Sequence, residues 1–517
     1  MPDDKVDSDF IDYVEPEESH SVSTLRKSIS QYCAVLIASL LAITYGFSVG
    51  FTIIITHQLQ NDTRITHVTD SQITWIGSMN YFSTPLGAMA GGALAQRLGR
   101  RNTLLLLTIP YFISWMLISY SSTVNEILIA FIVIGTAGGI VDPTLQVYAT
   151  EISESRLRGE ISCFITTTIM FGVFLQTIVG MFVDWRNLAM FCGLAPAFGL
   201  LLIGFVPESP YWLASKGRLG DARQALCRLR GWTTPQMVRH EYDQILQSTV
   251  DLNSSYKPPF FSKEHFKRMS RPAVRLPFIL VSFAFFVSCF NGTTSILTYA
   301  LDTFELLESP INIHTATIIF TGLQMLGSIL LFFIVPKTGK RWPTFVSLIV
   351  AGSSFLIVSV YVFMRNQRFF KVSCNPWLKW IPLLALEISV FATTLGIETT
   401  PWILVGEVFP GDVRACATGL VTSIGFIFAA VASKIFHSML SVLTVSGTFM
   451  FFATVNYVGL VVLYYFMPET EGRTLAEIEE HFAGKHKLDD PTTGPEGTEL
   501  MPINSSHTNG TRKYADA

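Results

Sequence analysis

The chain has 517 residues, of which half are apolar and only 15% are charged, and its formal net charge is −3. Soluble domains carry roughly 25% charged residues, so this composition excludes an ordinary soluble protein, and no basic aromatic patch indicates a nucleic acid as partner. Only Cys374 of the 7 cysteines falls in a predicted external loop, which excludes a disulfide framework. The composition predicts an all-α membrane protein.

Twelve apolar stretches follow one another along the chain. Each has about 20 residues, the length that a helix needs to cross a hydrocarbon layer roughly 30 Å thick. Their expected positions are 32–55, 73–95, 103–120, 126–149, 161–183, 187–206, 276–300, 313–335, 342–364, 378–408, 414–440 and 444–467. The acidic segment before the first stretch lacks the basic start and cleavage site of a signal peptide, so we expect the first stretch to be a true membrane span.

A long polar segment after the sixth stretch divides the spans into two sets of six. We therefore predict five regions along the chain. These are an N-terminal tail 1–31, a first six-helix bundle 32–206, a linker 207–272 with short helices, a second six-helix bundle 273–467 and a C-terminal tail 468–517.

Lysine and arginine in the short loops indicate which side of the protein faces the cytoplasm. If both termini are cytoplasmic, the inner loops hold nine of these cations, namely Arg97, Arg100, Arg101, Arg156, Arg158, Lys337, Lys340, Arg341 and Arg414. The outer loops then hold five, namely Arg64, Arg186, Arg365, Arg368 and Lys371. The excess predicts that the linker and both tails are cytoplasmic.

An internal repeat relates the two halves, because three signatures return in the same order. Gly99-Arg100-Arg101 returns as Gly339-Lys340-Arg341. The spacing of Glu151 and Arg158 returns in Glu407 and Arg414, and Pro207-Glu208-Ser209 returns as Pro468-Glu469-Thr470. Two related six-helix halves of this kind place a substrate site between them near the membrane midplane, and access to it alternates as the halves rock.

Together these motifs resemble those of the sugar porter family of the major facilitator superfamily over residues 32–480. The motifs that carry the resemblance are Pro207-Glu208-Ser209-Pro210-Tyr211-Trp212-Leu213, Pro468-Glu469-Thr470-Glu471-Gly472, Tyr148 with Glu151-Ile152-Ser153, Arg158-Gly159, Pro401-Trp402 and Gly406-Glu407 with Phe409-Pro410. The resemblance implies the major facilitator fold, with twelve transmembrane helices as a 6+6 pseudo-repeat. It also implies a plasma-membrane carrier of a small-molecule sugar, in contact with membrane lipid, that is not an enzyme and uses no cofactor and no metal.

Three details are more similar to the insect trehalose transporter branch than to the vertebrate glucose carriers. They are Asp184-Trp185-Arg186-Asn187-Leu188-Ala189, Gly406-Glu407 and Lys434-x-Phe436. They favour trehalose as the substrate.

The resemblance also implies a gate at the cytoplasmic face, where the family's arginines and glutamates latch the carrier when it faces outward. The matching residues are Arg100, Arg101, Glu151, Arg158 and Glu208 in the first half and Arg341, Glu407, Arg414 and Glu469 in the second. Bidentate contacts between arginine and carboxylate would give such pairs a defined register. The alternative is that these residues are ordinary anchors at helix ends. Departures from the family pattern at Gln96, Pro336 and Ala415 predict a weaker latch.

A sugar site needs amide and hydroxyl groups and an aromatic side chain. The resemblance retains the family's substrate contacts at Trp402 and Gln324, and it places Thr294 and Thr166 where the family has an asparagine and a glutamine. Asn291 is a further candidate, which could partly compensate for the lost amides. Other family contacts are replaced by Ser288, Cys289 and Gly425. Each mapped residue could instead serve helix packing. The replacements predict a pocket that suits a polyol but differs from that of the glucose carriers.

Four ionisable residues fall within predicted spans, where a charge is costly. Glu398 lies near the middle of span ten, and we expect it to face the cavity, where it could accept substrate hydroxyls, bind a cation, exchange a proton or be a structural acid. Asp142 is a second candidate. Glu387 and Lys434 lie at similar depths, which predicts a structural ion pair near the outer surface.

The sequon Asn61-Asp62-Thr63 lies in a predicted external loop, so Asn61 is the expected glycan acceptor. Taken together, the sequence predicts a facilitative uniporter of a hexose or a disaccharide such as trehalose, working by alternating access. Three other functions remain open: a proton-coupled symporter, a carrier of a non-sugar solute and a non-transporting sugar sensor. The oligomeric state is left open.

Overall fold

The structure is a computed structural model that describes residues 24–62, 64–65, 68–154, 157–254, 271–367, 376–410, 413–470, 478 and 481–482. Its described residues form helices and connecting turns, without strands. The first half contains α1 (Thr24–Ala38), α2 (Leu40–Gln58), η1 (Leu59–Asn61), α3 (Asp70–Leu98), α4 (Arg100–Tyr120), α5 (Val124–Ile152), α6 (Arg158–Phe182), α7 (Trp185–Leu202) and η2 (Ile203–Phe205).

The described part of the linker contains α8 (Pro210–Ser215), α9 (Leu219–Leu229) and α10 (Arg239–Ser254). The second half contains α12 (Pro272–Phe290), α13 (Thr293–Thr298), α14 (Ala300–Leu306), α15 (Ile313–Thr338), α16 (Arg341–Asn366), η4 (Pro376–Lys379), α17 (Trp380–Thr394), α18 (Thr400–Glu407), α19 (Arg414–Val442) and α20 (Thr444–Phe466).

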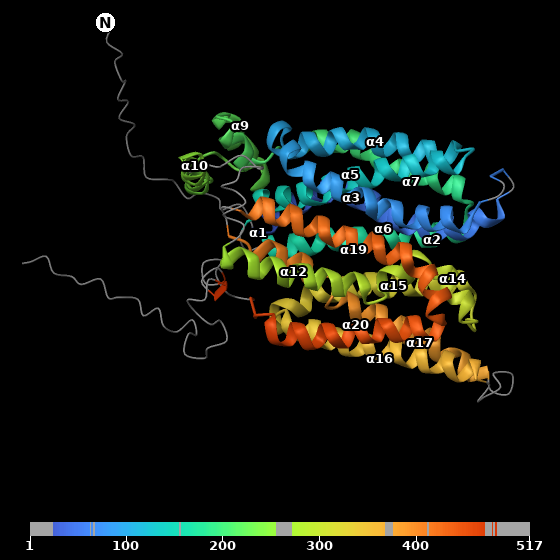
Figure 1. The fold of residues 1–517 in the computed structure, drawn as a ribbon. Helices are drawn as coiled ribbons and strands as arrows, with labels where there is room; N and C mark the ends of the chain where they lie inside the picture. Colours follow the sequence, from blue (N-terminus) through green and yellow to red (C-terminus); the bar gives the residue numbers. More distant parts are fainter. Residues whose placement is uncertain are drawn as a thin grey trace, which may run out of the picture.

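The long helices lie side by side in one bundle, and α9 and α10 lie beside one end of it (Figure 1). We call this end the linker end and the opposite end, where α14 lies, the far end. The two halves meet where α3 packs against α19 and α6 packs against α15. In the order of spans these contacts join the second to the eleventh and the fifth to the eighth. A shift of six spans converts one contact into the other, so the interface repeats the internal symmetry of the sequence.

Eleven of the described helices are long and apolar enough to cross a membrane by length and composition. The helix α3, which corresponds to the predicted second span, has 29 residues but is less apolar. Its small and polar residues face other helices instead of lipid. A Cβ added at Gly87 would lie 1.9 Å from the carbonyl oxygen of Thr136 on α5, and one at Gly139 would lie 2.0 Å from that of Thr84 on α3. Close backbone contact between the two helices therefore requires these glycines.

The seventh span is broken twice. Helix α12 ends at Phe290, and Gly292, with φ of 106°, begins the short helix α13. Tyr299 then separates α13 from α14. The breaks are stabilised by polar side chains, because the Asn291 Oδ1 accepts from the Thr293 amide at 2.8 Å and the Asn456 Nδ2 donates to the Asn291 carbonyl at 3.1 Å. Such satisfaction of freed backbone groups is what permits irregular backbone at membrane depth.

The tenth span is also broken, between α17 and α18. The Thr400 hydroxyl donates to the carbonyl oxygen of Gly396 at 2.9 Å, and the Ile397 amide donates to the Ser347 hydroxyl at 3.0 Å. Pro401 stands in the first turn of α18, where proline is tolerated because its missing N–H would be unpaired anyway. Glu398 lies in this break.

The linker helices are fixed to the first half through Arg230, whose side chain is buried. Its guanidinium donates to the Ile152 carbonyl at the end of α5 at 3.0 Å and to the Glu241 carboxylate on α10 at 2.9 Å. On the other side, the Ser30 hydroxyl of α1 donates to the Arg228 carbonyl at 2.8 Å. The linker helices thus continue the first half at the linker end.

Candidate functional site

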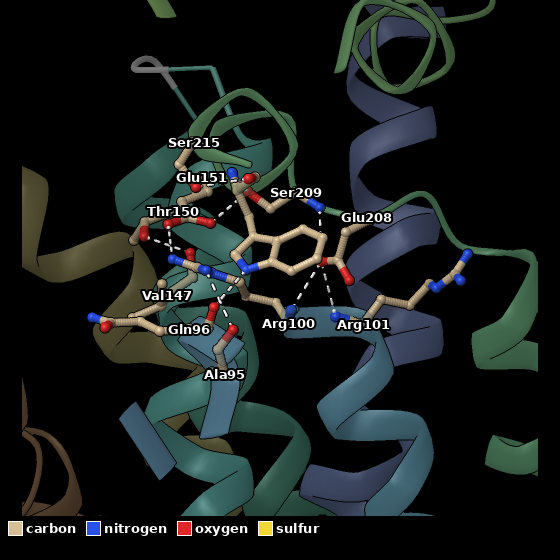
Figure 2. Close-up of polar contacts among 11 residues, drawn as sticks. Ala95, Gln96, Arg100, Arg101, Val147, Thr150, Glu151, Glu208, Ser209 and Ser215 are labelled. Carbon is tan, nitrogen blue, oxygen red and sulfur yellow. Dashed lines mark hydrogen bonds and ion pairs between the residues drawn. The ribbon is translucent and has the colours of Figure 1, made fainter. Parts of the chain in front are cut away.

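A polar cluster around Glu208 lies at the linker end of the first half (Figure 2). Its Oε1 accepts from the backbone amides of Arg100 at 2.9 Å, Arg101 at 3.1 Å and Ser209 at 2.9 Å. The carboxylate therefore caps the N-terminus of α4, where the helix dipole favours a negative charge. Gly99, with φ of 97°, is required here, since a Cβ on it would lie 2.4 Å from the Glu208 Oε2.

Glu151 belongs to the same cluster, at the last turn of α5. It accepts from the Arg100 guanidinium at 2.8 Å and from the Ser209 hydroxyl. The Trp212 indole lies beside the cluster and donates to the Gln96 carbonyl at 2.9 Å. The cluster joins α3, α4, α5 and α8, all of which are in or attached to the first half.

The second half repeats this cluster. The Glu469 carboxylate accepts from the backbone amides of Lys340 and Arg341, each at 3.2 Å, and so caps α16. The Lys340 ammonium contacts both oxygens of Glu407 at 2.6 Å, and the Thr470 hydroxyl donates to Glu407 at 2.8 Å. Lys340 therefore has the role of Arg100. The sequence prediction named Arg341 instead, whose guanidinium donates to the Tyr464 carbonyl at 3.1 Å.

The predicted gate residues fall into two groups in the structure. Arg100, Arg101, Glu151 and Glu208 come together in the first half, and Arg341, Glu407 and Glu469 in the second. The side chains of Arg158 and Arg414 lie outside the described residues. Every ion pair described among the predicted gate residues and Lys340 stays within one half. The sequence prediction missed Lys340. The internal repeat aligns Lys340 with Arg100, and this alignment could have identified it.

Gln324 and Glu398 form a polar pair at the broken tenth span. The Gln324 Nε2 on α15 donates to the Glu398 Oε1 at 2.9 Å, and the Thr394 hydroxyl donates to the Glu398 Oε2 at 3.1 Å. Gln324 lies on α15, the helix of the second half that packs against α6 of the first. The pair therefore lies where the two halves face each other. The Gln324 Oε1 is buried and has no partner among the described residues, so it is an acceptor available to a ligand.

An aromatic group lies close to this pair. Trp402 on α18 contacts Phe285 edge to face, with ring centroids 5.0 Å apart, and contacts Phe426 at 5.4 Å. A Cβ at Gly425 would lie 2.7 Å from the Phe285 ring. Gly425 therefore makes room for Phe285, a residue that the sequence prediction missed.

The other predicted substrate residues are less clearly arranged. Asn291 is fully buried at the break of the seventh span, and its Nδ2 has no partner among the described residues. Thr294, on α13, and Thr166, on α6, are half-buried. Thr166 belongs to the first half, on the helix that packs against α15.

The predicted ion pair between Glu387 and Lys434 is wrong. The Lys434 ammonium donates to the Thr74 hydroxyl at 2.8 Å and to the Ser71 carbonyl at 3.3 Å, and it lies over the Trp75 ring at 4.0 Å. The carboxylate oxygens of Glu387 are buried without a hydrogen-bond partner among the described residues. Depth alone gave the prediction, but α19 packs against α3, while α17 packs against α15 and α16.

Contacts between the halves gather toward the far end. The His57 Nδ1 lies 3.0 Å from the Asp302 Oδ1, and the Thr177 and Thr321 hydroxyls lie 2.8 Å apart. The two hydrogen bonds of Lys434 add to these contacts. Toward the linker end, by contrast, a Cβ added at Gly92, Gly406 or Gly419 would have nothing described within 4 Å of it. The described hydrogen bonds between the halves therefore lie toward the far end.

Asp62, which follows η1, organises the turn after α2. It accepts from the Arg64 amide at 2.7 Å, the Ile65 amide at 3.0 Å and the Trp185 indole at 3.0 Å, and it pairs with Arg186. Burial raises the pKa of Asp62, but the hydrogen bonds from Ile65, Arg186, Arg64 and Trp185 outweigh it and bring the pKa below its ordinary value. The neighbouring side chain of Asn61 lies outside the described residues.

The fold, with two six-span halves that meet through equivalent helices, defines a membrane carrier of the major facilitator type. A family profile described as "Sugar (and other) transporter" matches residues 33–482. The protein therefore belongs to the sugar transporter family of the major facilitator superfamily.

Relatives of known name agree with this family. The chain is 27% identical over 452 residues to a facilitated trehalose transporter of Bombyx mori, which covers 87% of this chain and 86% of the relative. It is 27% identical over 459 residues to a facilitated trehalose transporter of Apis mellifera ligustica, covering 88% of each.

Solved structures share the fold. A proton:xylose symporter, XylE, bound to 6-bromo-6-deoxy-D-glucose matches with a TM-score of 0.69 at 20% identity, covering 88% of this chain and 100% of that chain. The inward open conformation of the xylose transporter XylE from E. coli matches with a TM-score of 0.68 at 20% identity, covering 87% and 99%. At this identity the likeness concerns the fold.

Proposed function

We propose that this protein is a facilitative carrier of a hexose or a disaccharide, with trehalose as the first candidate, and that it works by alternating access. The proposal places it in the plasma membrane with the linker end in the cytoplasm, because the excess of lysine and arginine lies in the loops at that end. The names of the insect relatives support trehalose.

The observation that carries the proposal is the pair of Gln324 and Glu398. Glu398 holds one amide hydrogen of Gln324 and leaves the Gln324 Oε1 without a described partner. Carboxylate and amide oxygens are acceptors, and sugar hydroxyls are donors. Trp402 supplies an aromatic face within the same span as Glu398. A ring of hydroxyls with an apolar face suits such a site better than an apolar or anionic solute would.

We propose that the two clusters at the linker end keep each half rigid while the halves rock. Each cluster ties helices of one half together through one carboxylate cap and one ion pair, and these contacts do not need to break during rocking. Arg158 and Arg414 stand at the N-termini of α6 and α19, the helices at the interface between the halves. They are the residues we propose to latch the halves to each other when the linker end closes.

The test is uptake of labelled trehalose and glucose at external pH of about 5.5 and 7.5, in cells that express the wild type or Glu398→Gln. Glu387→Gln is the matched control, because it neutralises another intramembrane acid outside this pair. We expect saturable uptake of a sugar by the wild type and the control, with a KM raised about tenfold in Glu398→Gln through loss of a charged hydrogen bond.

Each other outcome identifies a different function. If uptake by the wild type rises at acidic pH and uptake by Glu398→Gln does not, the protein is a proton-coupled symporter. Absence of uptake of either sugar, with the protein at the cell surface, would mean that the carrier serves another solute or acts as a sensor.

A further inference from the structure

His57 and Asp302 join the two halves at the far end of the bundle. His57 is next to the last residue of α2, and Asp302 lies in α14, the final piece of the broken seventh span. The His57 Nδ1 and Asp302 Oδ1 are 3.0 Å apart, and each side chain is 23% exposed. The contact is thus partly shielded from solvent but remains within reach of protons from the far side.

Several titratable side chains surround the contact between His57 and Asp302. The His314 ring on α15 meets the His57 ring edge to face, with centroids 6.4 Å apart, and Glu305 on α14 adds a negative charge near His57. His437 on α19 faces Asp302 and packs edge to face on Tyr299 at 4.5 Å, with Asp70 of α3 acting on it from the first half. The Asp302 Oδ2 is buried and has no hydrogen-bond partner among the described residues. Asp302 therefore has a single described hydrogen-bond partner, which is His57.

Asp302 lies on a short helix that follows both breaks of the seventh span. Helix α14 has 7 residues, and the irregular backbone at Tyr299 and the left-handed Gly292 separate it from α12. A Cβ on Gly292 would lie 2.7 Å from the Phe452 ring, so this bend is packed around a glycine. A short helix that follows two breaks can change its angle relative to the long helix before them.

We propose that His57 and Asp302 are gating residues that form a proton-sensitive latch across the far end, so that acid on that side holds the carrier closed there. The neutral imidazole makes a hydrogen bond with Asp302, whereas the imidazolium makes an ion pair, which is the stronger contact. The pair exists only while the far end is closed. Protonation therefore favours the closed state, and histidine is the side chain whose ordinary pKa, about 6.5, lies in the physiological range.

The other far-end contacts do not share this property. The Thr177–Thr321 contact involves hydroxyl groups only, and Lys434 with Thr74 involves an ammonium with an ordinary pKa of about 10.4. Only the contact of His57 with Asp302, among the described hydrogen bonds between the halves, changes charge between pH 5 and 8. The latch rests on the proposed orientation, in which the far end faces outside.

The experiment measures access to Cys289, which is buried beside Gly425 of α19. If the proposal holds, a membrane-impermeant maleimide reaches this thiol from outside only when the far end opens. It uses the full-length chain with Cys374→Ser and compares wild type, His57→Gln and His57→Lys in intact cells. Rates are compared between variants at the same pH, because thiol reactivity itself depends on pH. Cys289→Ser gives the background. No sugar needs to be transported, so this readout does not depend on the proposed substrate.

We expect His57→Gln to label about two- to fivefold faster than wild type at pH 5.5 and at a similar rate at pH 7.5, as loss of a partly exposed ion pair predicts. His57→Lys, which keeps the ion pair at both pH values, should match wild type at pH 5.5 and label more slowly than wild type at pH 7.5. Asp302→Asn should behave as His57→Gln. Where a sugar is carried, its entry should slow as external pH falls, the direction opposite to a proton-coupled symporter.

Two results would overturn the latch. One is a ratio of His57→Gln to wild type that is the same at both pH values. The other is identical labelling of His57→Gln and His57→Lys at pH 5.5, since a purely structural role for His57 would not distinguish a neutral from a charged replacement.

Discussion

Glu208 and Glu469 make the same contact in the two halves of the molecule. Each carboxylate accepts from two consecutive backbone amides at the start of a long helix, Arg100 and Arg101 in one case and Lys340 and Arg341 in the other. Each also lies against a glycine with positive φ, Gly99 or Gly339. The repeat in the sequence is therefore a repeat of a helix cap.

The equivalence of the two caps gives a stability prediction. Glu208→Gln and Glu469→Gln should each lower stability by about 1–2 kcal/mol, because a neutral amide interacts less well with the positive end of a helix. The apparent unfolding temperature in detergent measures this loss. Asp221→Asn, which removes an exposed carboxylate paired with Arg218, is the control and should leave the unfolding temperature almost unchanged. Equal behaviour of all three variants would contradict the role of the caps.

Lys340 should matter more than Arg341 to the second cluster. Its side chain is 6% exposed and contacts both oxygens of Glu407. Lys340→Met leaves that carboxylate unpaired in a partly buried place and should cost about 1–3 kcal/mol. Arg341→Met removes a hydrogen bond to the Tyr464 carbonyl and should cost less. Thermal unfolding of the two variants compares them, and Lys340→Met with Glu407→Gln should recover part of the loss. A larger loss in Arg341→Met would restore the assignment made from the sequence.

Lys434 should couple to the first half and not to Glu387. A double-mutant cycle between Lys434→Met and Thr74→Val, with stability as the readout, should give an interaction energy of about 0.5–1 kcal/mol. The cycle between Lys434→Met and Glu387→Gln should give none, since Glu387 has no described hydrogen bond. Coupling in the second cycle alone would show that the two residues do meet.

Asp62 gives a prediction with a defined dependence on pH. Its pKa is lowered in the folded protein, so its contribution to stability is complete above the ordinary aspartate pKa of about 3.9 and is lost as pH falls through the lower folded value. Stability of the loop should therefore be constant between pH 5.5 and 7.5, and Asp62→Asn should lower it throughout this range. Protease cleavage of the loop in intact cells measures the effect.

The same substitution also helps to test orientation. Asp62→Asn keeps an N-x-T sequon at Asn61, whereas Asn61→Gln removes it. A glycan that persists in Asp62→Asn and disappears in Asn61→Gln would place the far end outside. A glycan at Asn504 or Asn509 of the C-terminal tail would reverse the orientation.

Much of the fold could be predicted from the sequence, because helices in lipid must be long and apolar. The span around α15, for example, was predicted at 313–335 and its helix is Ile313–Thr338. The breaks in the seventh span were not predicted, since Asn291 and Asn456 satisfy the freed backbone only through tertiary contacts. The same limit explains the error at Lys434. Residue spacing gives depth along a helix, but the neighbour that a side chain meets depends on how helices pack.

The candidate site was predicted in part. Gln324 and Glu398 were both named as candidates. They lie 74 residues apart in the sequence, so the spacing of residues along one helix could not predict their hydrogen bond. Phe285 was missed because an aromatic residue in an apolar helix carries no distinguishing pattern. The glycine at position 425 was the one indication in the sequence that a bulky side chain from a neighbouring helix packs there.

The confinement of each described ion pair at the linker end to one half has a consequence for assembly. The described caps and ion pairs there each use partners from a single half, so we expect each half to fold on its own side of the linker. A carrier encoded as two separate polypeptides, divided between residues 255 and 270, should reassemble in the membrane through the faces of α3, α6, α15 and α19. Such a split protein would let each half be labelled, mutated or replaced independently of its partner.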